Sequence, residues 1–186
     1  MSPAGSVSKD PVSHIDLVPT LLDYFGMAAP SILQGRSLLP QMRNPAHRTN
    51  DFVFMEFNRF EIDHDGFGAF APMRSVFDGR YKLVINLLDT DEFYDLTADP
   101  LELQNRVNDP ASTPERERLL DELLAWMNRT RDPLRGPHWA RRPWGSRPGS
   151  TWGGPTRPRP FDEAYYPKTL LYDTGKVIDR LEYSKH

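Results

Sequence analysis

A long amphipathic helix pattern over residues 113–129 does most to limit what this chain of 186 residues can fold into. Its apolar residues recur at helical spacing along one side, and such a stripe is stable only when a sheet or another helix covers it. Ser112 and Glu115 match the capping box S-x-x-E, and Pro114 suits a first helical turn. The helix is therefore predicted to begin at residue 112 or 113. Its predicted buried stripe is Leu119, Leu120, Leu123, Leu124 and Met127, with Arg116, Glu122 and Arg129 expected to point outward.

Short strand patterns precede this helix and supply a sheet for it to cover. Residues 52–57 form a nearly continuous apolar run, which is typical of a strand covered on both faces. Residues 73–77 and 81–85 flank Asp78-Gly79, a strong tight-turn dipeptide, and so predict an antiparallel hairpin. Residues 92–96 supply one more strand. The predicted class is α+β, a small antiparallel sheet of about four strands packed by a C-terminal amphipathic helix.

A first helix is predicted well before the sheet, over residues 17–25. Asp16 is expected to cap it, and Gly26 suits a left-handed C-terminal stop. Because a long connection separates this helix from the sheet, its apolar face is expected to belong to a neighbouring domain that the chain lacks. The predicted organisation is the end of a catalytic domain at 1–45, a C-terminal subdomain at 46–134, and an extended basic arm and tail at 135–186.

The composition excludes several classes of protein. The formal net charge is −3, so no global charge excess indicates nucleic acid or a membrane surface as a partner. The chain contains no cysteine, which excludes disulfides, thiolate metal sites and a thiol nucleophile. No run of about 18 apolar residues is present and the start lacks a signal-peptide core, so no membrane segment is expected.

The densest cluster of candidate ligands lies at residues 61–66, between two predicted strands. It does not fit a calcium-binding EF-hand, because Pro72 stands where a bidentate glutamate is required and no helices flank it. Long loops carried by a sheet are common places for binding residues, and the flanking phenylalanines are suited to stack on a substrate. A solvated loop pinned by those aromatic residues is the alternative. The candidate substrate-binding residues are Arg59, Glu61, Asp63, His64 and Asp65.

Ser112 is the one candidate nucleophile. Residues 112–116 nearly match the C/S-x-P-[SA]-R sequence that maturation enzymes convert to formylglycine, but Glu115 stands where a small residue is required. The capping-box interpretation accounts for the same residues without any chemistry. No G-x-S-x-G, P-loop or H-E-x-x-H motif is present, and the five histidines are scattered. No catalytic or metal-binding residue is therefore predicted in this chain.

A basic stretch rich in proline, glycine and tryptophan follows the long helix at residues 135–160. It holds six arginines and no acidic residue. Arginine binds sulfate, phosphate or carboxylate with two parallel hydrogen bonds, and indoles stack on sugars or bases. The favoured interpretation is an extended arm that docks on the negatively charged remainder of its own enzyme. A sulfated or uronic ligand comes second, and a nucleic-acid tail is the least favoured.

Two blocks of the sequence resemble the sulfatase family. The first, V-S-H-I-D-L-V-P-T-L-L-D over residues 12–23 followed by Gly26, resembles the helix after the last strand of the catalytic domain. The second comprises residues 73–86, residues 92–100 and the helix at 113–129. It is similar to the small C-terminal subdomain of the branch that resembles N-sulfoglucosamine sulfohydrolase. The order and spacing of the blocks make the resemblance specific.

The resemblance implies the C-terminal part of an alkaline-phosphatase-like enzyme that hydrolyses sulfate esters or sulfamates on saccharides. In such enzymes a formylglycine hydrate attacks sulfate while calcium and basic residues stabilise the charge. Those motifs lie upstream of the first block, so neither cofactor is placed in this chain. The implied partners are an N-terminal catalytic domain and a sulfated saccharide. Localisation stays open, since family members are often periplasmic, secreted or lysosomal.

Two other hypotheses remain beside the sulfatase interpretation. A stand-alone binding module would use the acidic loop and the basic arm for an anionic glycan or nucleic acid. Alternatively, the chain could be a truncated product that self-associates into an oligomer through the uncovered apolar face of its first helix.

Overall fold

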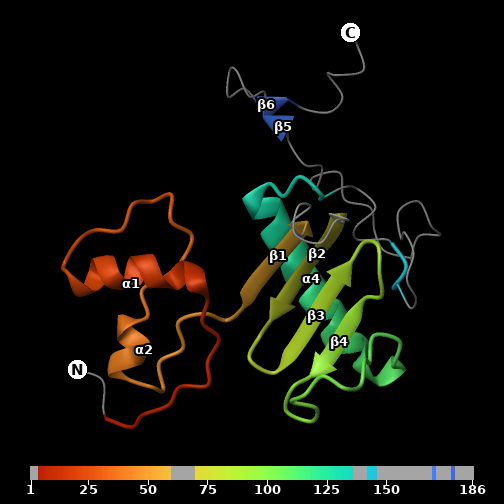
Figure 1. The fold of residues 1–186 in the computed structure, drawn as a ribbon, viewed down its shortest axis with the longest axis horizontal. Helices are drawn as coiled ribbons and strands as arrows, with labels where there is room; N and C mark the ends of the chain where they lie inside the picture. The colour runs from red at the N-terminus through yellow and green to blue at the C-terminus, as the bar shows by residue number, and fades with distance from the viewer. Residues whose placement is uncertain (1–3, 60–69, 136–141, 146–168, 171–176, 179–186) are drawn as a thin grey trace, which may run out of the picture.

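The computed structural model describes residues 4–59, 70–135, 142–145, 169–170 and 177–178. A helical N-terminal unit is followed by a sheet with one long helix behind it (Figure 1). The N-terminal unit contains a 3-10 turn, η1 (His14–Asp16), and the helices α1 (Leu17–Tyr24) and α2 (Leu39–Arg43). The sheet unit contains β1 (Val53–Arg59), β2 (Phe70–Phe77), β3 (Tyr81–Asn86), β4 (Glu92–Asp95), the 3-10 turn η2 (Pro110–Ser112) and α4 (Thr113–Thr130). Two further strands of two residues each, β5 (Thr169–Leu170) and β6 (Val177–Ile178), pair antiparallel in a separate sheet.

The four strands lie in the order β1-β2-β3-β4, each antiparallel to the next. This arrangement confirms the predicted α+β class. The predicted hairpin is β2-β3, and its turn depends on two residues. The Asp78 carboxylate accepts hydrogen bonds from the amides of Arg80 (2.8 Å) and Tyr81 (2.7 Å), while Gly79 adopts φ +98°, which favours glycine.

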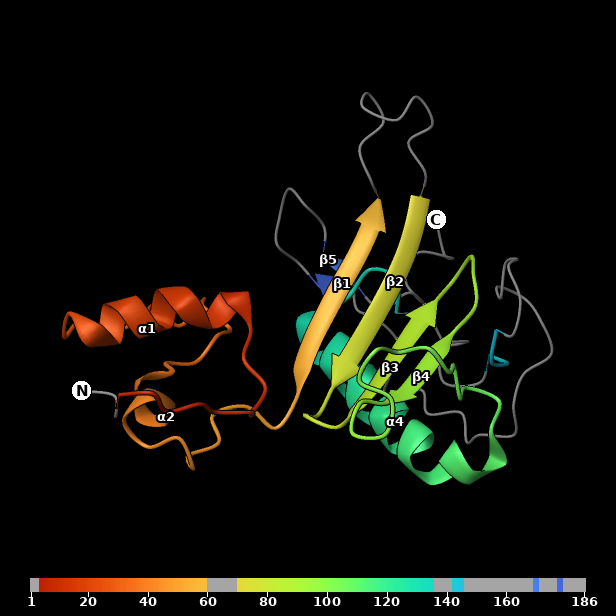
Figure 2. The ribbon, with the colours of Figure 1, turned by 60° about the horizontal axis from the view of Figure 1, so that its bottom comes forward.

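Helix α4 lies across one face of the sheet and forms the core with it (Figure 2). The predicted stripe of the helix is buried, as are the strand residues that face it. On β1, Phe54 stacks on Trp126 of the helix with ring centroids 5.0 Å apart. The core therefore forms as the helical spacing predicted. Its members are Val76, Leu83, Ile85, Leu87, Phe93, Val107, Leu119, Leu120, Leu123, Leu124 and Met127.

Two details of α4 differ from the prediction. Ser112 does not cap the helix with its side chain, because η2 runs directly into α4 and gives Ser112 helical dihedrals. The side chain of Asp109 caps the turn instead, accepting from the Ala111 amide at 2.9 Å. Arg116 is buried rather than outward, since it lies three and four residues before the first two leucines of the stripe. It donates to the Val107 carbonyl.

The N-terminal unit is held together by Asp16, which is buried. The prediction that Asp16 caps α1 is wrong, because η1 precedes the helix and turns the carboxylate away from it. The carboxylate accepts instead from the amides of Ser13 and Arg36 (both 2.9 Å) and from Nδ2 of Asn50 (2.8 Å). Asp16 thereby joins the start of α1 to the two segments that follow it.

The apolar face of α1 is exposed, as the sequence predicted for a helix that needs a neighbour. Pro19 is its one buried residue, whereas Leu21 is 57% exposed. The face continues beyond the helix to Phe25, which is 69% exposed. Within the described residues, no helix is both long and apolar enough to cross a membrane. The exposed large apolar side chains of this helix and its end are Leu17, Val18, Leu21, Tyr24 and Phe25.

Strand β1 is an edge strand, and the prediction that both of its faces are covered is wrong for this chain. Phe54 packs toward α4, but Met55 and Phe57, which point to the other face, are 45% and 41% exposed. Figure 2 shows that, among the described residues, no helix covers that side of the sheet. The apolar run at 52–57 thus carries more hydrophobic surface than this chain buries.

Candidate functional site

Of the predicted binding residues, Arg59 lies at one end of the sheet, where β1 ends and β2 begins. Arg59 is the last residue of β1 and is the register partner of Phe70, the first residue of β2. The register shifts between Phe57 and Arg59, which marks a β-bulge. Bulges redirect a strand and are common beside functional sites. The other candidates, Glu61, Asp63, His64 and Asp65, lie outside the described residues.

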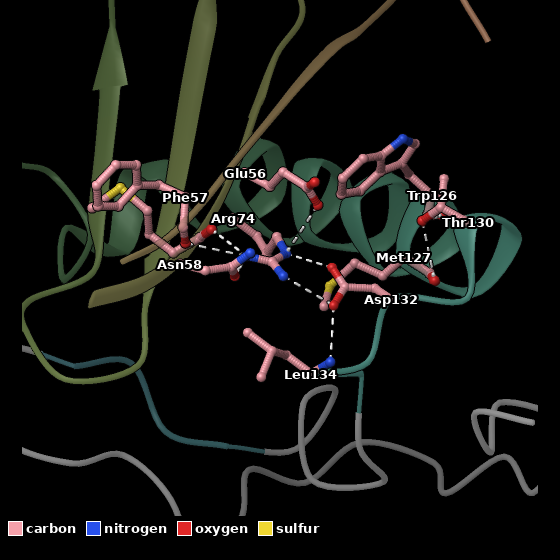
Figure 3. Close-up of polar contacts among 10 residues, drawn as sticks. Glu56, Phe57, Asn58, Arg74, Trp126, Met127, Thr130, Asp132 and Leu134 are labelled. Atoms are coloured by element: carbon pink, nitrogen blue, oxygen red, sulfur yellow. Dashed lines mark hydrogen bonds and ion pairs between the residues drawn. The ribbon is translucent and has the colours of Figure 1, made fainter. Parts of the chain in front are cut away.

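Arg74 on β2 holds this end of the sheet together (Figure 3). Its side chain is 1% exposed, and all three of its guanidinium nitrogens are engaged. Nη1 donates to the carbonyl oxygens of Phe57 (3.3 Å) and Met73 (2.8 Å). It also donates to Oδ1 of Asn58 inside the bulge, at 2.9 Å. Nε and Nη2 pair with the two carboxylate oxygens of Asp132, the second at 3.0 Å.

Asp132 brings the segment after α4 into the same cluster. Arg131 ends the helix in the left-handed conformation, and the amide of Asp132 then donates to the Met127 carbonyl at 2.9 Å. The Asp132 carboxylate also accepts from the Leu134 amide at 2.9 Å. Arg74 therefore forms a structural ion pair with Asp132. Its partner could not have been predicted, because 58 residues separate the two and no local pattern links them.

A second buried carboxylate, Asp91, fixes part of the basic arm. Asp91 is 0% exposed, and its Oδ1 accepts from the Asn86 amide (2.9 Å) and from Nη2 of Arg142 (2.5 Å). Its Oδ2 accepts from the Gly145 amide (2.6 Å), and its own amide donates to the Gly145 carbonyl (2.9 Å). Residues 142–145 are thus docked on the sheet unit, as the favoured interpretation of the arm expects.

The described part of the arm offers no free arginine to a ligand. Arg135 and Arg142 are the two of its six arginines that lie in described residues, and both are buried. Trp144, the described tryptophan of the arm, has the Arg116 guanidinium 4.7 Å from its ring centroid. These groups are used inside the fold, so they do not add to a surface for anions.

A hollow of about 620 Å³ lies where the N-terminal unit meets the β2-β3 turn. Arg48 bridges the two sides by donating to the Asp78 carbonyl at 2.7 Å and lying 3.7 Å from Asp10. Burial raises the pKa of Asp78, but hydrogen bonds from Arg118 and from the amides of Tyr81 and Arg80 outweigh it and leave that pKa below its usual value. Arg48 pairs with Asp10 and Arg118 pairs with Asp78 at this seam, which makes it a structural junction.

The described residues do not fit the cofactors that the resemblance implies for a complete enzyme. No three histidine, aspartate or glutamate side chains converge on a common point within the described part of the chain. The sequence has no cysteine, and Ser112 is buried at the start of α4. We therefore assign no described residue to calcium or to formylglycine.

The small antiparallel sheet backed by α4, together with the uncovered face of α1, is the arrangement that the sequence resemblance implies for a C-terminal subdomain. Residues 2–129 match the family described as N-sulphoglucosamine sulphohydrolase, C-terminal, and the chain belongs to this family. The resemblance seen in the sequence is thereby confirmed.

Relatives with known names are longer than this chain. Uncharacterized sulfatase YidJ of Escherichia coli (strain K12) is 42% identical over 165 residues, which cover 89% of this chain and 32% of the relative. Human N-sulphoglucosamine sulphohydrolase is 30% identical over 181 residues, covering 69% of this chain and 34% of the relative. The chain therefore spans about a third of the length of these relatives.

Solved structures agree with the sequence comparisons. A putative sulfatase from Bacteroides thetaiotaomicron superimposes with a TM-score of 0.54 at 29% identity, covering 75% of this chain and 30% of that structure. A structure described as BT1596, a 2-O GAG sulfatase, gives the same TM-score and identity and covers 73% of this chain and 31% of that structure. Again about a third of each larger protein corresponds to this chain.

Proposed function

We propose that this chain is the C-terminal part of a sulfatase that hydrolyses sulfate esters or sulfamates on saccharides, and that it completes the enzyme without performing the chemistry alone. The observation that carries the proposal is the exposed apolar face of α1, in a chain that spans about a third of its sulfatase relatives. A catalytic domain that precedes the chain would cover this face and would supply formylglycine and calcium.

A chimera tests this proposal. The segment of the E. coli relative that corresponds to this chain is replaced by the chain itself, which is feasible because the two are 42% identical. The chimera is expected to be soluble and to hydrolyse an aryl sulfate or a sulfated disaccharide, while the relative truncated before this segment is inactive. An insoluble or inactive chimera beside an active parent enzyme would count against the proposal.

Within such an enzyme, we propose that Arg59 and the residues after it form part of the wall of the substrate pocket. The β-bulge at the end of β1 and the buried Arg74 cluster beneath it support this, because they give the strand end a fixed support. The proposed substrate-binding residues are Arg59, Glu61, Asp63, His64 and Asp65.

Substrates of two sizes test the pocket wall. In the chimera, His64→Ala and Asp63→Ala should lower kcat/KM for a sulfated disaccharide by about tenfold or more, as expected when one charged hydrogen bond is lost. Turnover of a small aryl sulfate, which cannot reach the wall, should change little. Glu122→Ala on α4 is the matched control. Equal effects on both substrates would assign these residues to stability and not to recognition.

A stand-alone module that binds anionic glycans or nucleic acid is the alternative function. The buried Arg135 and Arg142 argue against it, because they remove two arginines from the surface that such a module would use. A salt titration decides the matter. Binding of a sulfated glycan or an oligonucleotide by the isolated chain, with affinity that falls steeply as salt rises, would favour the module.

A further inference from the structure

One face of the sheet is partly uncovered and apolar. Side chains alternate along each strand, so every second residue of β1 and β2 points away from α4. On this outer face, Phe57 is the register partner of Met73, and Met55 is the partner of Ser75. Met55 and Phe57 are exposed and Met73 is half-buried. The part of the outer face formed by Met55, Phe57 and Met73 is called the open patch below.

The other half of the same face is already covered by this chain. On β3, Lys82 forms an ion pair with Glu102, which belongs to the connection between β4 and α4. The Lys82 ammonium also lies 5.5 Å from the centroid of the Tyr94 ring on β4. Tyr94 and Val84, which share this half, are consequently buried. The open patch is therefore limited to the β1-β2 side of the face, where the connection does not reach.

The sequence of β1 independently favours a cover over the open patch. Residues 52–57 carry apolar side chains on both faces of the strand, with Glu56 as the one charged residue, a pattern typical of strands buried on both sides. In the described part of this chain, Phe54 packs on α4, whereas on the outer face Val53 is buried but Met55 and Phe57 are exposed. A strand that faces water on one side ordinarily alternates apolar and polar residues. The pattern of β1 thus matches a larger assembly better than the isolated chain.

We propose that the open patch is a second docking surface for the sulfatase catalytic domain that precedes this chain, in addition to the exposed face of α1. This inference rests on the function proposed above. Two facts select this partner. About two thirds of each relative lies outside the part matched by this chain, and β1 follows directly on the N-terminal unit that carries α1 (Figure 1). A single preceding domain is therefore the occupant that we assign to both surfaces, and interfaces of about 600–1,500 Å² are usual between domains.

Oxidation of methionine tests the open patch directly, since a thioether reacts with peroxide only when it is accessible. Met55, 45% exposed, should oxidise readily in the isolated chain and at least tenfold more slowly in the chimera. Met127, which is 0% exposed, should resist oxidation in both and serves as the control. Equal rates for Met55 in an active chimera would overturn the second docking surface while leaving the proposed function intact.

Charge substitution gives the second arm of the experiment. Phe57→Lys should lower the melting temperature and the activity of the chimera while changing the melting temperature of the isolated chain little, since the side chain is 41% exposed there. Ala125→Lys, at an exposed position of α4 on the opposite side of the sheet, should leave both proteins unchanged. If Phe57→Lys destabilises the chimera and the isolated chain equally, or destabilises neither of them, the open patch is not a docking surface. If the chimera with the natural residues does not fold, the proposed function fails together with this inference.

Discussion

Replacing Arg74 with alanine should lower the free energy of unfolding by about 3–5 kcal/mol, the range measured when one partner of a buried ion pair is removed. The structure supports a loss of this size, because the side chains of Arg74 and Asp132 are each 1% exposed. The substitution leaves the Asp132 carboxylate buried without its cation. It also removes the hydrogen bonds to Asn58 and to the carbonyls of Phe57 and Met73.

Urea unfolding followed by far-UV circular dichroism measures this loss, with the slope m checked for constancy between variants. The matched control is Arg129→Ala, because Arg129 is exposed in the last turn of α4 and its loss should change stability by no more than about 0.5 kcal/mol. The double substitution Arg74→Met with Asp132→Leu removes both charges and should be less harmful than Arg74→Ala alone. A loss below about 1 kcal/mol for Arg74→Ala, or a double variant worse than the single one, would refute the reasoning.

Three further predictions concern separate parts of the fold. Gly35→Ala should unfold or loosen the N-terminal unit, because the added Cβ would lie 2.0 Å from the Ile15 carbonyl oxygen; an unchanged melting temperature would contradict the close approach. Leu123→Ala should cost about 2–5 kcal/mol in urea unfolding, since the side chain is fully buried between α4 and the sheet, and a cost under about 1 kcal/mol would mean that the helix packs loosely. The folded pKa of Asp78 lies below 3.8, so its contribution to stability is complete above that pH and is lost as the pH falls through the folded value. The melting temperature of Asp78→Asn should accordingly be lower than that of the natural chain at pH 7 and should approach it below about pH 4, whereas a constant difference across this range would exclude Asp78 as the titrating group.

The parts of the fold that follow from local pattern could be predicted from the sequence. The Asp78-Gly79 turn fixes the β2-β3 hairpin through two short-range hydrogen bonds and a positive φ. The leucine spacing of α4 predicted its buried stripe, because periodicity directly reports which side of a helix faces a core. The exposed face of α1 was predicted because a long connection separates this helix from the sheet, so that its apolar face was expected to belong to a neighbouring domain.

Contacts between distant segments could not be predicted in this way. Asp16 resembles a helix cap in sequence, but its carboxylate accepts from Arg36 and Asn50, which approach only after the chain has folded. The pairing of Asp91 with Arg142 spans 51 residues and likewise has no local signal. For the candidate site, the sequence predicted Arg59 as a binding residue just after the strand at 52–57, but the Arg74 cluster beneath it depends on tertiary packing.

The central claim is that this chain completes a sulfatase without carrying the chemistry. The most direct measurement is the initial rate of aryl sulfate hydrolysis, in the presence of calcium, by the isolated chain, by the truncated E. coli relative and by the chimera of the two. We expect turnover from the chimera alone. Calcium-dependent hydrolysis by the isolated chain, or equal rates from the relative with and without this segment, would contradict the claim.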